Sequence, residues 1–440
     1  MTNRPEEPDS WDVIDNLDIE AEQQSFLLIA AVALSFLESY EQNSKPVRIP
    51  KWEHQRIDWN EHVTKLLHEN RFHREYRMSL EAFNQLLELL RPSITVNVVK
   101  SNASSGLYSS NQHIYPELIL AIGLRWLAGG NLIDIRHVYG VSYPSVYAIT
   151  KTFLDAVNSC TALSIKFPTT NKEKQTVMNG FLEKSEQQLF CGCIGAIDGY
   201  LQPISKPRKK DCDGFPQAYW SGHYMSYGLN VQAVCNSNCC FLYFGVVAPG
   251  KCPDQKAFER TKLFQIVSNL RPGQYIVGDA AYTLTDQVLC PFVGSQREST
   301  NKDAYNYFLS QLRIRIEMTF GLLTNKWRIL RTSLSFRMKK SVAILSACAR
   351  LHNFCLLMDD DKKKELANGM EFLTSLELVD PMPNAPLGWA YLPTVRKLDV
   401  VQGTSQIRQI ILDVVTNNGF RRPPANVLRR WRELTEIGLM

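Results

Sequence analysis

Three acidic residues, Asp198, Asp279 and Glu317, are the side chains of this sequence whose type and setting could do chemistry together. Asp is disfavoured inside strands, yet two apolar runs, LFCGCIGAIDGY and QYIVGDAAY, each lead into an aspartate. Sites gather at strand ends in α/β units. Because the set contains no Cys or His, it suits Mg²⁺ or Mn²⁺ rather than zinc. Two such ions about 3.5–4 Å apart can activate the attacking oxygen and stabilise the leaving oxygen of a phosphodiester.

Each acid also has an ordinary explanation. Asp198-Gly199 and Gly278-Asp279 are typical turn dipeptides, and Asp254 can cap a helix. Glu317 lies in a predicted helix, where it can pair with Arg313 four residues earlier. Gly321, one turn beyond Glu317 on the same face, lacks a side chain and so permits close packing of the glutamate towards the sheet.

The charge around these acids favours a phosphate substrate. Glu317 is the single acid in residues 311–340, against eight basic residues: Arg313, Arg315, Lys326, Arg328, Arg331, Arg337, Lys339 and Lys340. The loop after Asp198 adds four more: Lys206, Arg208, Lys209 and Lys210. A lone acid among bases, on the same unit as a basic loop, is what an enzyme acting on a phosphate backbone needs. A solvated helix face plus a nuclear-import-like run, SKPRKK, fits the same residues.

The elements that would position the acids form a mixed α/β unit. After a polar stretch near 166–188, the sequence predicts a strand ending at Asp198, then a hairpin from SYGLNVQAVCN and FLYFGVVAPG. The first hairpin strand alternates polar and apolar residues and is predicted to be half-buried. A helix capped by Asp254, a strand ending at Asp279, a long helix over about 302–330 and a final helix, SVAILSACARLHNFCLLM, complete the unit.

The preceding region is predicted to be helical. DWNEHVTKLLHE and MSLEAFNQLLELL have helical spacing; Ser79 is the expected cap of the second and Pro92 its expected end. Residues 98–112 are typical of a loop. A helix from Pro116 to Leu127 ends at Gly129-Gly130.

The next two predicted helices have the layout of a helix-turn-helix. Asn131 caps a short helix ending near Tyr139, Gly140 makes the turn, and Ser142 caps a longer helix. Early residues of such a second helix contact base edges in the major groove, which would involve Tyr143, Ser145, Val146 and Lys151. A plain helical hairpin, with Ile135, Val138, Val141, Val146 and Ile149 in the core, explains the same pattern, and both interpretations stay open here.

Composition and the N-terminal residues limit the class of protein to which this chain can belong. The chain has 440 residues, 45% hydrophobic and 21% charged, with a net charge of +5, which excludes extensive disorder. Residues 1–23 form an acidic stretch with no signal-peptide pattern, and the apolar run at 25–37 is too short to span a bilayer, which takes about 20 residues. It suits an amphipathic or buried helix. An odd count of eleven cysteines indicates reduced thiols rather than a disulfide scaffold.

Six blocks in order closely resemble the nuclease domain of PIF/Harbinger-type transposases, a DDE superfamily. They are GAIDG, SGHYMSYGLNVQAVCNSN, APGKCPDQKAF, YIVGDAAYTL, YNYFLSQLRIRIEMTFGLL and RLHNFC, between about 190 and 355. Upstream, RWLAGG, IRHVYGVSYPSVY and IDWNEHV resemble the helical DNA-binding region that precedes that nuclease.

The resemblance implies a ribonuclease-H-like fold that cuts and joins DNA at element ends with Mg²⁺ or Mn²⁺. Its catalytic, metal-binding acids fall on Asp198, Asp279 and Glu317, and Asp254 matches a supporting acidic position. Tyr200 stands where many relatives have a Thr-His pair. The resemblance also implies double-stranded DNA as partner, a Myb-like accessory protein, a homo-oligomer, nuclear localisation and no membrane association.

The expected organisation is an acidic tail plus apolar helix over 1–50 and a helical region with helix-turn-helix over 51–165. An α/β DDE nuclease domain over 190–357 and a C-terminal tail over 358–440 follow. Two other functions fit the same fold: a domesticated, non-cutting DNA-binding or adaptor protein, and a ribonuclease. The intact acid triad argues against the first, and the upstream helix-turn-helix argues against the second.

Overall fold

A computed structural model describes residues 28, 30–32, 34–35, 56–95, 114–294, 299–358 and 404–424. The chain divides into two compact units, residues 1–54 and 55–440. In the first unit the described residues are helical, as predicted for 25–37, but Leu28, Val32 and Leu34 are exposed rather than buried. The acidic stretch, the predicted loop at 98–112 and most of the C-terminal tail lie outside the described residues.

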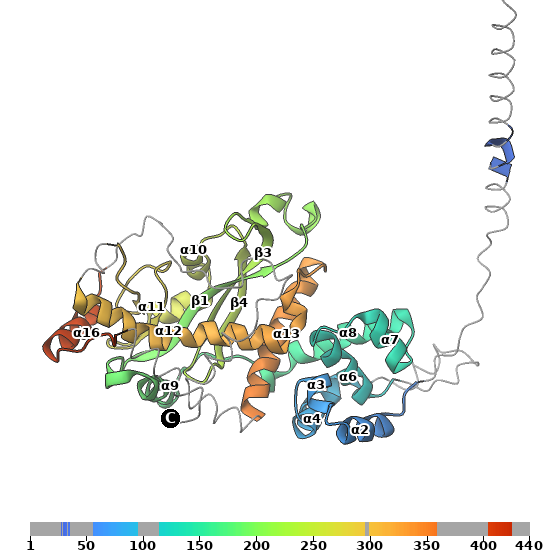
Figure 1. Ribbon diagram of the computed structural model, residues 1–440, viewed down its shortest axis with the longest axis horizontal. Helices are drawn as coiled ribbons and strands as arrows, with labels where there is room; N and C mark the ends of the chain where they lie inside the picture. The colour runs from blue at the N-terminus through green and yellow to red at the C-terminus, as the bar shows by residue number, and fades with distance from the viewer. Residues whose placement is uncertain are drawn as a thin grey trace, which may run out of the picture. The chain divides into compact units, whose positions relative to one another are not determined.

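In the N-terminal part of the second unit, residues 56–95 and 114–159 as described contain six helices (Figure 1). They are α2 (Trp59–His68), α3 (Phe72–Tyr76), α4 (Leu80–Ile94), α6 (Pro116–Leu127), α7 (Leu132–Tyr139) and α8 (Tyr143–Ser159). The Ser79 hydroxyl caps α4 as predicted, but α4 continues through Pro92 to Ile94. The prediction that Pro92 ends the helix is wrong, because a proline in the last turn removes one backbone donor without forcing the chain out of the helix.

The predicted boundaries of α6, α7 and α8 are confirmed. The Asn131 side chain accepts from Ile133 N at 2.8 Å, Gly140 adopts the left-handed conformation (φ 60°), and Ser142 Oγ accepts from Ser145 N at 3.3 Å. Val146, which fitted either interpretation of this motif, is fully buried and belongs to the core.

The rest of the unit is built on a mixed sheet in the order β2-β3-β1-β5-β6, with β4 also paired to β3. The strands are β1 (Cys193–Pro203), β2 (Trp220–Ser221), β3 (Ser226–Cys235), β4 (Phe241–Pro249), β5 (Tyr275–Val277) and β6 (Val288–Leu289). β3 is antiparallel to β1, β2 and β4, whereas β5 runs parallel to both β1 and β6. The predicted hairpin is therefore confirmed as β3 and β4.

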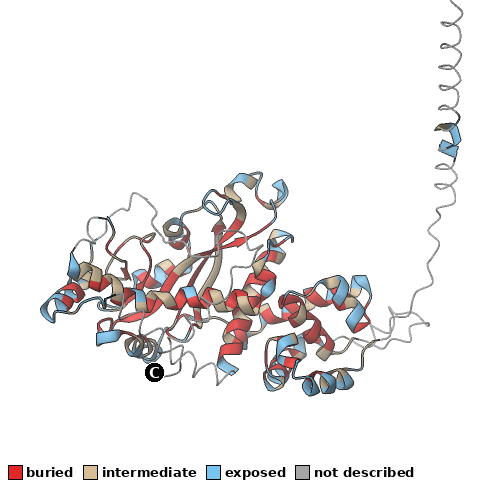
Figure 2. Ribbon diagram, viewed as in Figure 1, coloured by how far each residue is buried: buried red, intermediate tan, exposed pale blue. Residues whose placement is uncertain are grey.

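Helices cover the sheet and bury its side chains (Figure 2). The long helix α12 (Thr300–Lys326) packs on β1 and β3, and α13 (Met338–Met358) packs on β4 and on α8. Because helices shield the sheet, β3 is buried along most of its length, so the prediction of a half-buried strand is wrong. α9 (Asn171–Lys184), which packs on β1, occupies the polar stretch at 166–188, where composition predicts no element; a Thr170–Glu173 capping box begins it.

Two predicted boundaries near the acids are corrected. β1 does not end at Asp198 but continues for five residues to Pro203, where it meets the segment around Leu334 through a parallel bridge from Ile204. The helix predicted after Asp254 is two helices, α10 (Asp254–Glu259) and α11 (Lys262–Ser268), and the Thr261 side chain caps the second. Asp254 is the first residue of α10 and makes no capping hydrogen bond there.

Part of the predicted C-terminal tail is folded onto the α/β region. Helix α16 (Gln406–Asn417) packs on α12 through Ile411, Leu412 and Val415, which are buried. Ser405 Oγ bonds Asp286 Oδ1 at 2.8 Å, and Phe420 packs edge-on against Phe308 with ring centroids 6.3 Å apart.

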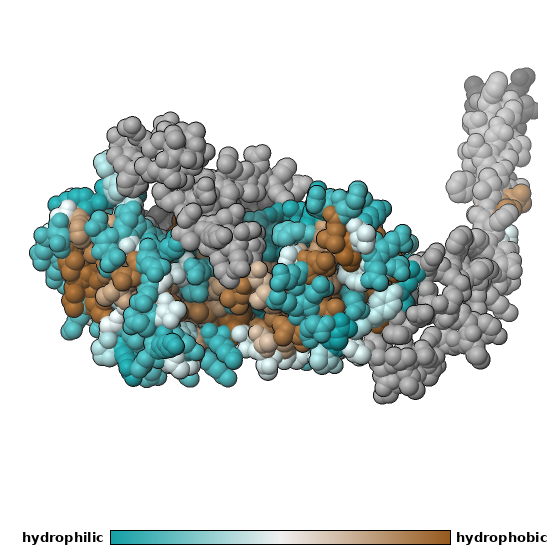
Figure 3. Space-filling view, turned by 90° about the horizontal axis from the view of Figure 1, so that it is seen from below, coloured by the Kyte–Doolittle hydropathy of each residue, from teal (hydrophilic) through white to brown (hydrophobic). Residues whose placement is uncertain are grey.

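All eleven cysteines are free thiols, in agreement with the prediction of reduced cysteines. α13 has the length and hydropathy that a membrane span needs, but 61% of its apolar window is buried inside the unit, which is typical of a core helix. Hydrophilic side chains cover much of the face of the unit shown in Figure 3, with smaller hydrophobic patches between them.

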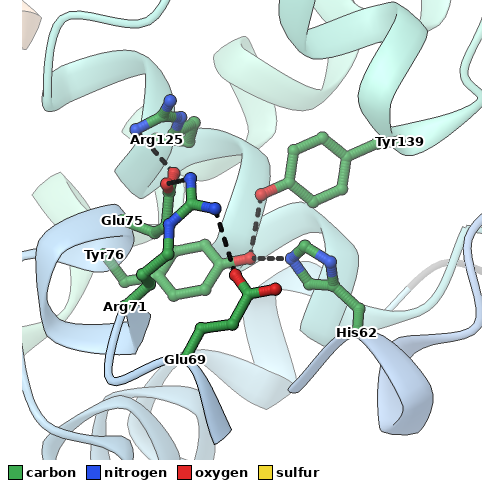
Figure 4. Close-up of polar contacts among 7 residues, drawn as sticks. All are labelled: His62, Glu69, Arg71, Glu75, Tyr76, Arg125 and Tyr139. Carbon is green, nitrogen blue, oxygen red and sulfur yellow. Dashed lines mark hydrogen bonds and ion pairs between the residues drawn. The ribbon is translucent and has the colours of Figure 1, made fainter. Parts of the chain in front are cut away.

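A buried polar network joins four of the N-terminal helices (Figure 4). Tyr76 OH lies 3.0 Å from His62 Nε2 and 2.9 Å from Tyr139 OH. Glu75 pairs with Arg125 at 2.7 Å and with Arg71 at 3.1 Å. Burial lowers the pKa of His62, an effect that Glu75 opposes and Lys65 reinforces.

We expect Val415→Asp to release α16 from α12, because it places a carboxylate in an apolar contact, whereas the neighbouring Val414→Asp should not. Val415 is fully buried and Val414 is 39% exposed, so the two variants place the same new carboxylate on different faces of α16. Hydrogen exchange of the α16 amides should accelerate at least about tenfold in the first variant, since about 1.4 kcal/mol is a factor of ten. Equal exchange in both variants would contradict the docking of α16.

The His62 network predicts a loss of stability in mild acid. The pKa of His62 is lower in the folded chain than the value of about 6.5 in unfolded chains, so the unfolded state binds the proton first as pH falls. The free energy of unfolding should therefore decrease below about pH 6.5, and His62→Gln should flatten this part of the profile. Urea unfolding at several pH values measures this free energy. The same pH dependence in the parent and in His62→Gln would refute the role of His62.

Candidate active site

Asp198 and Asp279 are brought together by the pairing of two parallel strands. In the register of β1 and β5, Ala196 lies opposite Val277, and each aspartate comes two residues later along its own strand direction. Side chains alternate between the faces of a sheet, so both carboxylates point to the same face at neighbouring positions. β5 ends at Val277, two residues before Asp279, so the predicted strand end at Asp279 is corrected; Asp279 itself is 8% exposed.

Helix α12 covers that same face and carries Glu317. Tyr200, two residues after Asp198 and on its face, stacks on Phe320 of α12 with ring centroids 5.1 Å apart. Glu317 precedes Phe320 by one turn, and its Oε1 lies 2.8 Å from NH2 of Arg313. The predicted pairing of these two residues is thus confirmed, with Arg313 mostly buried and the Glu317 side chain 47% exposed.

The three acids and Arg313 form one electrostatic cluster. Burial raises the pKa of Asp198 well above its usual value, and the nearby carboxylates of Asp279 and Glu317 raise it further, while Arg313 opposes them. Burial alone would lower the pKa of Arg313, but Glu317, Asp198 and Asp279 together raise it. The guanidinium of Arg313 is therefore the positive charge that balances the cluster.

Asp254 lies on the opposite face of the sheet. Its Oδ1 accepts from Asn230 Nδ2 at 2.9 Å and from Gln232 Nε2 at 3.2 Å. Gln232 pairs with Gly199 across β3 and β1, and a Cβ on Gly199 would lie 2.3 Å from Asp254 Oδ1. Since Gly199 and Asp198 face opposite sides of β1, Asp254 approaches the site from behind the strand.

A buried carboxamide network supports Asp254 and is not predicted from the sequence. Gln232 also accepts from Tyr282 OH at 2.7 Å, and Gln232 Nε2 donates to Asn230 Oδ1 at 3.0 Å. Both amides are buried, although the strand pattern places them on an outward, polar face. The sequence feature that could have indicated this network is an Asn and a Gln two residues apart on one strand, with a glycine, Gly199, opposite on the neighbouring strand.

The donor set fits Mg²⁺ or Mn²⁺ only in part. Asp198, which is half-buried, and Asp279, which is buried, are two neighbouring hard-oxygen ligands whose repulsion a cation would relieve. Across the described ranges, however, no three Asp, Glu, His or Cys side chains lie close enough to hold one ion. Glu317 is turned to Arg313, so it can join the aspartates only if that ion pair opens.

The predicted DNA-contacting residues differ in placement. Lys206, Arg208, Lys209 and Lys210 are exposed after β1, and Arg208 pairs with Asp211 at 3.0 Å. On α8, Tyr143 and Lys151 are exposed, Lys151 pairs with Asp155 at 2.7 Å, and Ser145 Oγ lies 2.7 Å from Ser142 Oγ. Arg315 is only 6% exposed, because its side of α12 faces the β3–β4 turn at Cys239, so burial removes it from the surface available to DNA.

A comparison with protein families identifies the segment that holds these acids. Residues 197–353 match the family described as DDE superfamily endonuclease. The match begins in β1 and ends in α13, so it includes Asp198, Asp254, Asp279 and Glu317. No curated protein and no solved structure matches the chain. The match supports the superfamily part of the resemblance, and the PIF/Harbinger subtype stays a prediction.

Gly199→Ala should destabilise the chain by about 1–3 kcal/mol, the usual cost of overpacking, because the new Cβ would overlap the Asp254 carboxylate. Gly222→Ala is the matched control, since nothing lies within 4 Å of the Cβ it would add. Urea unfolding of the two variants beside the parent gives the difference. Equal stability of both variants would show that Asp254 is not held against Gly199.

Proposed function

We propose that this protein is a divalent-metal-dependent DNA endonuclease of the DDE type that cuts and joins phosphodiesters at transposon ends. The observation that carries the proposal is the placement of Asp198 and Asp279 at neighbouring positions on parallel strands, within the segment that matches DDE superfamily endonucleases. Such enzymes generally use divalent metals. The family match covers the endonuclease part of this proposal. Transposition, action at DNA ends and the Harbinger subtype go beyond that match.

In this proposal Asp198 and Asp279 hold the metal, and Glu317 completes the ligand set after leaving Arg313. Bound metal would supply activation of the attacking oxygen and charge stabilisation of the leaving oxygen. Arg313, released from Glu317, remains beside the aspartates, where its guanidinium can contact a phosphate oxygen. The Asp254 network acts from the other face as a support that fixes β1 relative to β3.

DNA recognition is assigned to two surfaces. Tyr143, Ser145 and Lys151 at the start of α8 would contact the DNA groove, in keeping with a helix-turn-helix. The exposed loop with Lys206, Arg208, Lys209 and Lys210 would contact the backbone and, as a basic run, would also direct the protein to the nucleus. A Myb-like accessory protein and self-association are further parts of the proposal.

The test is metal-dependent nicking of DNA that carries the element's own ends, with accessory protein present. Asp279→Asn should reduce nicking in Mg²⁺ or Mn²⁺ by more than about 100-fold, beyond the usual loss for residues that only support a metal ligand. Asp413→Asn, the same change at an exposed position of α16, should leave nicking unchanged. Because Asp279→Asn removes a charge that repels Asp198, the variant should be at least as stable as the parent without metal.

Two outcomes would contradict the nuclease. Nicking that survives Asp279→Asn would exclude the two aspartates as the metal site. Sequence-selective DNA binding with no nicking by the parent protein would favour a non-cutting DNA-binding or adaptor protein. Cleavage that requires a 2′-hydroxyl would instead identify a ribonuclease.

A further inference from the structure

Four arginines meet where the N-terminal helices contact the end of α12, and they define an arginine cluster. Arg77 is the C-cap of α3, Arg125 lies on α6, and Arg328 and Arg331 lie on the short helix η6 (Arg328–Arg331) that follows α12. The elements are in direct contact: a Cβ on Gly129, just after α6, would lie 3.0 Å from Arg328 Cβ. Lys326 adds a fifth cation, since its Nζ bonds the Arg77 carbonyl oxygen at 3.1 Å.

The positive charges of the arginine cluster act on one another. Burial lowers the pKa of Arg77, and Arg328, Arg125 and Arg331 lower it further, while Glu75 opposes them. Arg331 shows the same effects, from burial and then Arg328. Glu75 pairs with both Arg125 and Arg71, so one carboxylate is shared between two guanidinium groups (Figure 4). Among the described residues no carboxylate forms an ion pair with Arg77 or Arg328, so these two charges are not balanced within the cluster.

Two features of Arg77 set it apart within the cluster. Arg77 Nε is buried and has no hydrogen-bond partner, so a donor is left unused at the centre of the group. Arg77 also adopts the left-handed conformation (φ 63°), which favours glycine or asparagine at the end of a helix. Arg328 is exposed, and Arg125 and Arg331 are half-exposed, so the guanidinium groups can reach a polyanion.

Two elements, α12 and β1, lead from the acids toward the arginine cluster. Along α12, nine residues at about 1.5 Å each separate Glu317 from Lys326, or about 14 Å. Along β1, four residues at about 3.3 Å each separate Asp198 from Gln202, or about 13 Å. Gln202 Nε2 then donates at 3.2 Å to the carbonyl oxygen of Thr332, the residue after Arg331. α12 and β1 therefore both lead from the acids toward the cluster, each over about 13–14 Å of backbone.

We propose that the arginine cluster is a backbone contact site for double-stranded DNA, binding phosphates other than the one that is cut. This inference rests on the proposed function and gives its substrate a second, sequence-independent contact. Guanidinium groups suit this role because their planar donors bind phosphate oxygens in pairs. The helical region and the α/β region each contribute arginines, so bound DNA would contact both.

The test is the salt dependence of binding to a short DNA duplex in EDTA, where no metal-dependent cutting occurs. Each lost phosphate contact reduces the slope of log K against log salt by about 0.9, so Arg328→Gln/Arg331→Gln should reduce it by about 1.8. Lys262→Gln/Arg271→Gln, an equal change of charge at exposed positions around α11, should leave the slope close to the parent's. Arg328→Lys/Arg331→Lys keeps the charge and should also keep the slope.

A slope in Arg328→Gln/Arg331→Gln equal to the parent's, in protein that unfolds at the parent's urea concentration, would overturn the proposal. A loss equal to that of the α11 control would also overturn it, since net charge would then explain the effect. Neither result bears on nicking, which is measured separately with metal. Conversely, a parent that never nicks DNA but shows the expected change of slope would refute the nuclease and keep the contact site.

Discussion

The structure depends on holding two carboxylates side by side inside a protein. Asp198 and Asp279 share one face of the sheet because β1 and β5 are parallel and in register, and each raises the cost of ionising the other. Such a pair is tolerated when a cation lies beside it or when one of the two carboxyl groups keeps its proton. In the described structure Arg313 supplies that charge, and its ion pair with Glu317 holds the third acid beside the guanidinium rather than with the two aspartates.

This arrangement explains why the site has a different support on each face of β1. On the face of Asp198, α12 provides Arg313 and Glu317 and is fixed by the stacking of Phe320 on Tyr200. On the other face, Asn230 and Gln232 hold Asp254 against Gly199. A glycine is needed at position 199 because any side chain would occupy the space of the Asp254 carboxylate. The strand that carries the key aspartate is therefore held from both sides.

The same long elements connect the acids to the arginine cluster. α12 continues from Glu317 to Lys326 and then into η6, while β1 continues beyond Asp198 to Gln202. A helix and a strand that carry catalytic candidates therefore both lead to the segment that holds Arg328 and Arg331.

The sequence by itself determined the elements whose signals are local. Caps at Ser79, Asn131 and Ser142, the left-handed turn at Gly140 and the pairing of β3 with β4 as a hairpin all follow from short-range hydrogen bonding and turn signals, and the structure confirms them. The motif blocks also directed attention to Asp198, Asp279 and Glu317. Their roles remain proposals; the fold places Asp198 and Asp279 at neighbouring positions and pairs Glu317 with Arg313.

Only the tertiary structure decided what depends on strand register and on burial from distant segments. The sequence placed Asp198 at a strand end, made Asp254 a helix cap and put Asn230 and Gln232 on an outward face; pairing and helix packing overrode all three. The arginine cluster assembles from residues about 250 positions apart, Arg77 and Arg328, and local periodicity carries no information about such contacts. The sequence gives the number and sign of the charges, but their electrostatic energy depends on the distances between them, and the fold sets those distances.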